Sequence, residues 1–229
     1  MDRDLFLERV RKQAIAGRAF PVPVNPEATS EQSYVGGGAD PVGTFLAEWQ
    51  GAGGQGARCR SLAEVNSYIR SLIERMGAKS VLCWKHPLLE KLKIDSTIRE
   101  YGAEPLLWDK LEGESEEERW LQTFAADLGI TSVDWGIAET GSLVVCSRAG
   151  GRGRAVSLLP PVHLALLEPS QILPDLFDLY ERLGEDLAGL PSNVALITGP
   201  SKTGDIQLQL TTGVHGPGEV HAVVCEFGL

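Results

Sequence analysis

Apolar residues form two kinds of pattern along this chain: repeats at helical spacing and short uninterrupted runs. Apolar residues at helical spacing follow Ser61 and Ser115, each with Glu three positions later. This capping-box pattern predicts one helix from Ser61 to Gly77 and another from Ser115 through Leu128. Segments of similar period, some opened by proline or closed by glycine, predict further helices. These span residues 2–17, 40–51, 87–93, 174–187 and 205–210.

Short apolar runs between these segments predict buried strands. They cover residues 80–84, 105–108, 136–138, 143–146, 163–167, 193–197 and 220–227. Helices that alternate with short buried strands indicate an α/β domain with a mostly parallel sheet. We expect residues 59–229 to form that domain. Residues 1–58, which include a proline- and glycine-rich loop, are expected to form a helical N-terminal appendage.

Composition and charge exclude several classes of protein. The chain has 229 residues, 43% of them hydrophobic, and a net charge of −10. Such an acidic balance argues against general nucleic-acid binding, which needs a basic surface. No apolar run approaches the ~20 residues that a membrane-spanning helix requires. The charged N-terminus lacks the apolar core of a signal peptide, so we expect a cytoplasmic protein with no membrane span.

The cysteines and histidines do not form a standard metal motif. Cys59, Cys83, Cys146 and Cys225 are isolated from one another, and most lie within apolar runs. Such cysteines behave as small buried hydrophobes. The spacing of His215, His221 and Cys225 matches no standard metal site. We therefore predict no iron–sulfur cluster, no other metal and no resident cofactor in this chain.

The break between the two strands at 136–138 and 143–146 carries the first candidate site. It reads Glu139-Thr140-Gly141-Ser142 and combines a carboxylate and two hydroxyls with a permissive glycine. A turn of this kind can present reactive groups while the backbone approaches a ligand closely. The alternative is a tight hairpin whose hydroxyls bind local amides, and composition alone favours it.

A second polar loop follows the strand expected at 193–197. A loop rich in Gly, Ser and Thr between a strand and a helix can bind an anion through backbone amides and the helix dipole. Lys202 would add a positive charge, although the loop is not a Walker A motif. Capping of the following helix by Ser201 or Thr203 is the alternative, and both interpretations can hold. The candidate ligand-binding residues here are Gly199, Ser201, Lys202, Thr203 and Asp205.

Two glycine-rich turns supply the remaining candidates. Arg152 and Arg154 could clamp a carboxylate or phosphate, although a solvated hairpin with exposed arginines is also expected of such a loop. His215, next to Gly216, could transfer a proton or bind a ligand, and a plain turn is the alternative. His163 is expected to pack within its strand. Nucleophile-elbow, zinc-protease and dinucleotide motifs are absent.

The segments GIAETGSLVV, SLLPPVHLALL, ITGPSKTGDIQ and GVHGPGEVHAVV occur in this order and together resemble the lactate-utilisation protein C family, the LUD domain. The resemblance covers roughly residues 60–227. The chain departs from the family pattern at Ser142, where Thr is usual, and at Lys202-Thr203-Gly204, where Arg-Thr-Ala is usual; both changes preserve chemical type.

The resemblance implies an α/β three-layer fold similar to sugar-phosphate isomerases and CoA transferases. It also implies a role in oxidising L-lactate to pyruvate with two iron–sulfur partner proteins, in which this chain would be the cluster-free subunit. CoA transferases of related fold use a glutamate nucleophile, which draws attention to Glu139 by analogy only.

The leading hypothesis is therefore a subunit that binds a small anionic ligand between these loops, with Glu139 or His215 handling a proton. In this hypothesis Lys202→Ala abolishes ligand binding without unfolding the chain. The alternatives are a stand-alone enzyme acting on a phosphorylated or CoA-linked molecule, and a structural or regulatory partner without a small-molecule site.

Overall fold

A computed structural model describes residues 3–17, 36–148, 151–185, 189–203 and 211–228. Contacts within the chain define two compact units, Met1–Val35 and Gly36–Leu229. The first unit contains helix α1 (Arg3–Gly17), the helix expected near the N-terminus. Apolar side chains of α1 such as Phe6 and Ile15 are exposed.

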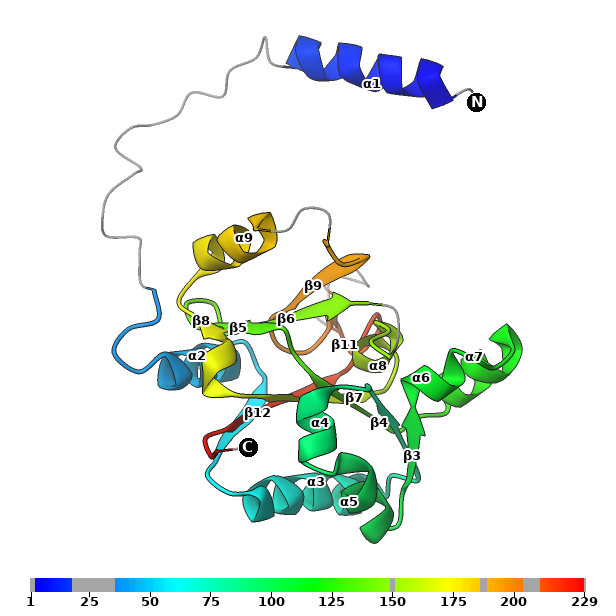
Figure 1. Ribbon diagram of the computed structural model, residues 1–229, viewed down its shortest axis with the longest axis vertical. Coiled ribbons are helices and arrows are strands. Elements are labelled where there is room, and N and C mark those ends of the chain that lie inside the picture. Colours follow the sequence, from blue (N-terminus) through cyan, green and yellow to red (C-terminus); the bar gives the residue numbers. More distant parts are fainter. Residues whose placement is uncertain (1–2, 18–35, 149–150, 186–188, 204–210, 229) are drawn as a thin grey trace. The chain divides into compact units, whose positions relative to one another are not determined.

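The second unit is built on a six-stranded parallel sheet (Figure 1). Its strand order is β1-β12-β7-β4-β2-β3, and every neighbouring pair is parallel. The predicted α/β class and parallel sheet are thus confirmed. The strands are β1 (Gln55–Cys59), β2 (Ser80–Cys83), β3 (Glu104–Leu107), β4 (Leu128–Ser132), β7 (Val162–Leu167) and β12 (Glu219–Cys225).

One face of this sheet is covered by α3, α4 and α5, and α3 shows how sequence sets the packing. Its apolar residues recur at helical spacing, and Val65, Ile69 and Leu72 are buried against the strands. Ser61 caps its first turn, and Gly77 ends it in the left-handed conformation that glycine adopts without strain. The helices are α3 (Leu62–Met76), α4 (Pro87–Lys91) and α5 (Ile94–Glu100).

The opposite face carries α2 (Pro41–Gly51), α8 (Ala155–Leu158) and a second sheet. Two glycines of the parallel sheet let these helices approach closely. A Cβ at Gly56 would lie 2.8 Å from Leu46 of α2, and one at Gly129 would lie 2.1 Å from the Val156 carbonyl of α8. The absence of side chains at both positions therefore sets how closely α2 and α8 approach the parallel sheet.

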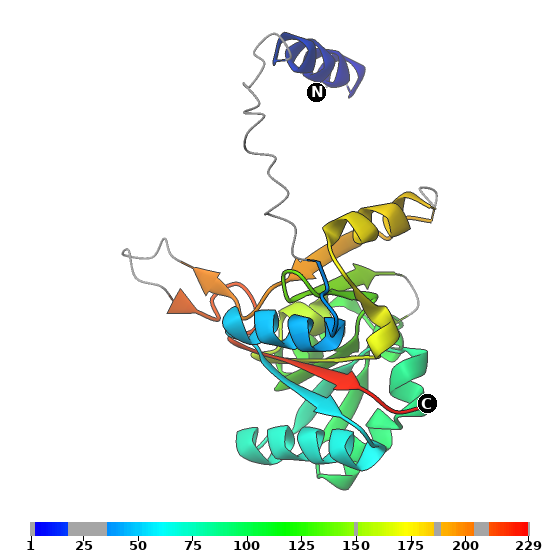
Figure 2. The ribbon, with the colours of Figure 1, turned by 90° about the vertical axis from the view of Figure 1, so that its left-hand side faces the viewer.

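The second sheet has the order β8-β5-β6-β9, with α9 against it (Figures 1 and 2). The predicted strand–turn–strand around Glu139 is the antiparallel pair β5–β6. The strand predicted at 193–197 is β9, but it pairs antiparallel with β6 and is only half-buried, so the prediction of a buried strand was wrong. The elements are β5 (Trp135–Ile137), β6 (Ser142–Ser147), β8 (Ile172–Leu173), β9 (Asn193–Ile197) and α9 (Leu176–Gly184).

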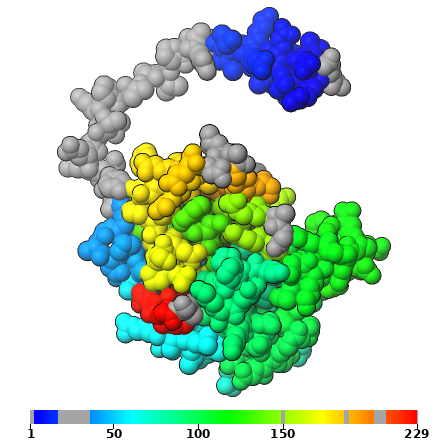
Figure 3. Space-filling view, viewed as in Figure 1, coloured from blue at the N-terminus to red at the C-terminus, as the bar shows by residue number. Residues whose placement is uncertain are grey.

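The remaining elements extend from the edges of the unit. Helix α7 begins at the predicted capping box of Ser115 and Glu118, but it ends at Phe124, and Leu128 opens β4 instead. Figure 3 shows α6 and α7 (green) projecting from the body of the unit. The short elements are α6 (Trp108–Leu111), α7 (Glu116–Phe124), the 3-10 turn Pro169–Gln171, β10 (Lys202–Thr203) and β11 (Thr211–Thr212).

Helix α2 belongs with the α/β unit. Phe45 and Trp49 are fully buried, and the Trp49 indole donates a 2.7 Å hydrogen bond to the carbonyl of Gln55 in β1. The compact units consequently divide after Val35, and not after residue 58 as the sequence pattern suggested. Residues 36–58 complete the core instead of forming an appendage.

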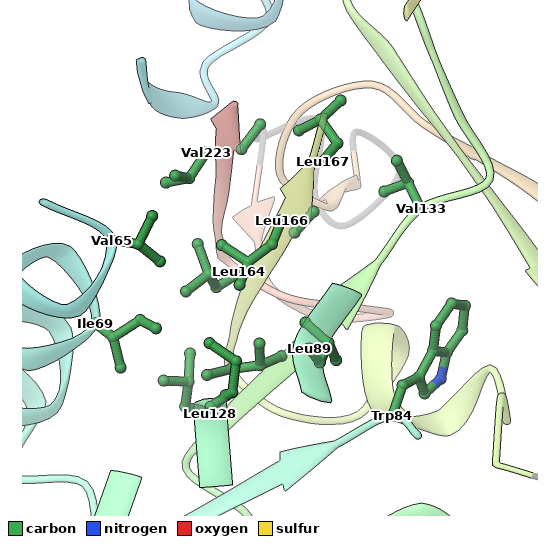
Figure 4. Packing of buried hydrophobic residues seen from close by; sticks show 14 of the residues in the cluster. Val65, Ile69, Trp84, Leu89, Leu128, Val133, Leu164, Leu166, Leu167 and Val223 are labelled. Carbon is green, nitrogen blue, oxygen red and sulfur yellow. The ribbon is translucent and has the colours of Figure 1, made fainter. Parts of the chain in front are cut away.

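A continuous apolar core fills the space around the parallel sheet (Figure 4). Val65 and Ile69 of α3 face the strand residues Leu164 and Val223, and all are fully or almost fully buried. The cysteines in the described residues are all free and buried, as the apolar runs around Cys83, Cys146 and Cys225 predicted for those three. No helix in the described ranges is both long and apolar enough to cross a membrane.

Candidate functional site

A cavity of about 380 Å³ lies where β9, the following loop, the loop before β12 and α8 meet. The strand end contributes Thr198, and the next loop contributes Gly199 and Ser201. His215 and Gly216 come from the loop before β12, and Arg154 precedes α8. Three of the four segments singled out in the sequence thus supply candidate residues to one cavity.

Hydrogen bonds connect the fourth segment, the Glu139–Ser142 turn, to this cavity. The Thr140 and Ser142 hydroxyl oxygens are 2.7 Å apart, and that of Ser142 is 2.6 Å from the hydroxyl oxygen of Thr198. Pairing of β6 with β9 places Ser142 beside the end of β9. A chain of hydroxyl groups therefore runs from the turn to the cavity wall.

Gly141 makes this turn possible. Its φ is +58°, and a Cβ there would lie 2.2 Å from the backbone nitrogen of Trp49. Any other residue would meet both backbone strain and a steric clash. The turn is thus held against α2, which fixes the position of the neighbouring hydroxyls.

The loops before β10 and β12 are joined by backbone hydrogen bonds. Ser201 donates its amide proton to the Pro217 carbonyl at 2.9 Å, and its carbonyl accepts from Gly213 at 3.0 Å. Gly199 has a φ of +78° and leaves no room for a Cβ beside the Ala52 carbonyl. These contacts bring Ser201 and His215 to one cavity although the loops are separate in sequence.

The charge of the cavity is opposite to that of the whole chain. Arg154 and His215 line it, and no carboxylate does so among the described residues. Arg154 is exposed, and within the described ranges its guanidinium has no ion-pair partner. A cation without a carboxylate partner, beside hydroxyl groups and backbone amides, is suited to bind a small anion.

Lys202 lies on the same loop but does not line the cavity. Its ammonium group donates to the Ala52 carbonyl at 2.8 Å. Lys202 and Thr203 form β10, which pairs with β11, so Ser201 precedes a strand and does not cap a helix. Asp205 and the helix predicted at 205–210 lie outside the described residues.

Glu139 is half-buried beside the hydroxyl chain. Its amide donates to the Pro174 carbonyl at 3.0 Å, while its carboxylate has no hydrogen-bond or ion-pair partner in the described part of the chain. It is not among the residues that line the cavity. The Glu139 carboxylate therefore lies close in sequence to the site residues, and no contact in the described chain prevents it from interacting with a ligand.

Arg152 has a different environment from Arg154. Its guanidinium forms an ion pair with Asp134, whose carboxylate also accepts from the amide of Cys146 at 2.8 Å. It lies 4.9 Å from the ring centre of Trp84, and only 16% of its side chain is exposed. Burial and the Arg152 charge lower the pKa of His86. The solvated-hairpin interpretation was thus wrong for Arg152.

His221 and His163 are buried within the parallel sheet, as predicted for His163. His221 bonds the Tyr68 hydroxyl at 2.8 Å and Glu219 at 2.7 Å. His163 bonds the Thr131 hydroxyl at 2.9 Å, and burial lowers its pKa to about 3. Among the described residues, His, Cys, Asp and Glu form no group suited to a metal ion.

Sequence reasoning missed several residues of the cavity wall. Thr198 was part of the second loop but was not singled out, and Asn193 and Ser157 carried no motif. The signal for Thr198 was its place directly after a strand and before Gly199. Asn193 and Ser157 become neighbours only through the pairing of β9 with β6 and the approach of α8.

The LUD domain family model matches residues 43–225. The chain is 35% identical over 161 residues to lactate utilization protein C of Halalkalibacterium halodurans, which covers 69% of this chain and 67% of that protein. It is 31% identical over 156 residues to the Bacillus subtilis protein of the same name, with 65% and 63% covered. The aligned part thus spans about two thirds of the length of these relatives.

A solved structure shares the fold. A DUF162 family protein from Deinococcus radiodurans superposes with a TM-score of 0.57 at 19% identity, covering 82% of this chain and 96% of that one.

Proposed function

Because the chain belongs to the LUD domain family, we propose that it acts in lactate utilisation, as the names of its relatives indicate for them. In this proposal it is the cluster-free subunit of a cytoplasmic assembly that oxidises L-lactate to pyruvate. Iron–sulfur proteins would be its partners. The subunit itself would bind a small anion.

The observation that carries the proposal is the cavity at Arg154 and His215. The chain has a net charge of −10, yet the described lining of this cavity contains a cation and no carboxylate. Thr198 and Ser201 add hydroxyl donors, and Gly199 and Gly216 allow close approach of the backbone. A carboxylate such as that of lactate or pyruvate has the charge and size to use these donors.

Thermal melting of the purified chain with lactate, pyruvate, inorganic phosphate and CoA tests the binding. A ligand that binds the folded state raises the melting temperature. We expect a carboxylate or phosphate to raise it, and Arg154→Ala to abolish the shift while Arg182→Ala preserves it. Arg182 is an exposed arginine of α9 without a partner in the described chain, so it controls for charge.

The assembly is tested separately by co-purification. We expect the tagged chain to retain the iron–sulfur proteins of a lactate-oxidising system, and Arg154→Ala to do so equally. A protein that binds anions but retains no such partner would refute the assembly and leave the binding site in place.

A second candidate is a stand-alone enzyme on a phosphorylated or CoA-linked molecule. The free Glu139 carboxylate, next to the hydroxyl chain, favours it. Turnover by the purified chain alone that is lost in Glu139→Gln, with anion binding retained, would establish this alternative.

A further inference from the structure

A second hollow borders the anion cavity and shares residues with it. It has a volume of about 500 Å³ and lies between α7, the Gly153–Ala155 segment and the start of β9. Arg154 and Asn193 line both spaces, so the two adjoin at these side chains. We name the second hollow the tryptophan groove, after Trp108 and Trp120 in its wall.

The tryptophan groove also holds a second arginine without a partner. Arg119 lines it together with Arg154, and neither forms an ion pair in the described chain. This is unexpected for Arg119, because residues 112–118 around it include Glu at five positions. Five other arginines of the unit, Arg58, Arg70, Arg75, Arg99 and Arg152, do pair with carboxylates.

Four of the five glutamates that precede Arg119 accept hydrogen bonds from their own segment. Glu118 accepts from Ser115 in the capping box, and Glu114 accepts from Gln122 at 2.7 Å. Glu112 and Glu116 accept from the indoles of Trp108 and Trp120, at 2.8 and 3.5 Å. No carboxylate lines the groove among the described residues. The two arginines therefore favour an anion in the groove, although five glutamates precede Arg119 in the sequence.

The aromatic residues add a surface for a planar group. Gly153 packs so closely against the ring of Trp108 that a Cβ at position 153 would clash with the ring. This close packing holds the indole beside Arg154. Trp120 is 46% exposed, and its ring is held by stacking on Phe124 with centroids 5.3 Å apart. An exposed, oriented indole is a platform on which a nucleobase can stack.

We propose that the tryptophan groove and the anion cavity together bind a nucleoside phosphate, with the base against Trp120 and the phosphates at Arg119 and Arg154. The arginines can bind an anionic phosphate while an aromatic ring stacks on a planar base, so together they suit a ligand that contains both groups. The net charge of −10 repels a long polyanion, so we expect the site to select a single nucleotide and not a nucleic-acid strand. This inference extends the proposed function, because Arg154 serves both spaces.

Calorimetric titration of the full chain tests the inference with ADP, ribose 5-phosphate and pyruvate as probes. We expect ADP to bind at least tenfold more tightly than ribose 5-phosphate, because ADP carries a base and a second phosphate. Trp120→Ala should reduce this advantage several-fold, because it removes the surface on which the base stacks. Arg119→Gln should weaken ADP about tenfold and leave pyruvate binding unchanged.

Matched controls are Phe177→Ala and Arg182→Gln on α9, an exposed aromatic and an exposed arginine away from both spaces. Neither should alter ADP binding. Equal affinity for ADP and ribose 5-phosphate, or an ADP affinity indifferent to Trp120→Ala and Arg119→Gln, would overturn the inference. Pyruvate binding in that case would leave the proposed function standing, whereas loss of binding for every probe would overturn both.

Discussion

Arg152 and Arg154 are separated only by Gly153, yet they belong to two regions of opposite character. Arg152 is largely covered at the carboxyl end of the parallel sheet, where its guanidinium pairs with Asp134 and lies over the ring of Trp84. Arg154 is exposed between the anion cavity and the tryptophan groove, without a carboxylate partner in the described chain. Net charge and composition cannot distinguish them. The two differ in whether a carboxylate of the described chain forms an ion pair with the guanidinium.

The comparison teaches that an arginine becomes available for a ligand when the fold places no carboxylate beside it. Arg152 forms an ion pair and a cation–π contact within the protein, so removing its side chain should lower the free energy of unfolding. Arg154 forms no ion pair in the described chain, so removing its side chain should weaken ligand binding instead. Two measurements can break or sharpen this distinction, and a third tests a buried titratable group elsewhere in the parallel sheet.

The largest effect is expected for Arg152→Ala. The change leaves the Asp134 carboxylate, only 11% exposed, without its counterion. Breaking a buried pair by removing one partner typically costs about 3 kcal/mol or more. Urea unfolding should show a loss of that size, while Arg154→Ala should stay within about 0.5 kcal/mol. Equal losses in the two variants would remove the distinction.

An intermediate effect is expected for Gly153→Ala, which alters the residue between the two arginines. Its Cβ would lie 2.2 Å from the Trp108 ring, so the ring or the backbone must move. Overpacking of this kind costs about 1–3 kcal/mol. Gly184→Ala, where a Cβ meets nothing within 4 Å, is the matched control and should change stability little in the same urea titration.

The smallest effect is expected from His163 at mildly acid pH, about 0.8 kcal/mol at pH 6. Burial lowers its pKa to about 3 in the folded chain, whereas the pKa of an unfolded histidine is about 6.5. The unfolded state therefore binds more protons between these values, and stability falls as the pH decreases below about 6.5, by up to about 1.4 kcal/mol per pH unit.

Urea midpoints measured from pH 7.5 to pH 5 check this titration. The slope should become shallower in His163→Gln, which can still bond the Thr131 hydroxyl but does not titrate. An unchanged slope would show that His163 does not govern the acid response. His221, whose pKa burial also lowers, contributes in the same direction and stays in both proteins.

Much of the fold could be predicted from local pattern. The capping boxes at Ser61 and Ser115 and the apolar run before Trp84 each act within a few neighbouring residues. The pattern was insufficient for β9, because an apolar run does not reveal which strand it pairs with. It was also insufficient for α2, whose Trp49 makes a core contact only once β1 is in place.

The candidate site was predictable to a lesser extent. The sequence identified the loops that contain Arg154, Ser201 and His215, because glycine-rich breaks between strands are visible without a structure. It could not separate Arg154 from Arg152, since Asp134 pairs with only one of them through tertiary contact. Whether Lys202 binds a ligand stays a prediction.

The position of β12 between β1 and β7 has a consequence for how the chain is made. The Gln55 side chain in β1 donates a hydrogen bond to the Glu219 carboxylate in β12, which lies 164 positions later in the sequence. In the described sheet β1 has no strand neighbour other than β12. Such long-range parallel pairing slows folding. During synthesis, β1 therefore has to wait until β12 has left the ribosome. Until then, β1 exposes an unpaired edge on which a chaperone, or another nascent chain, can act.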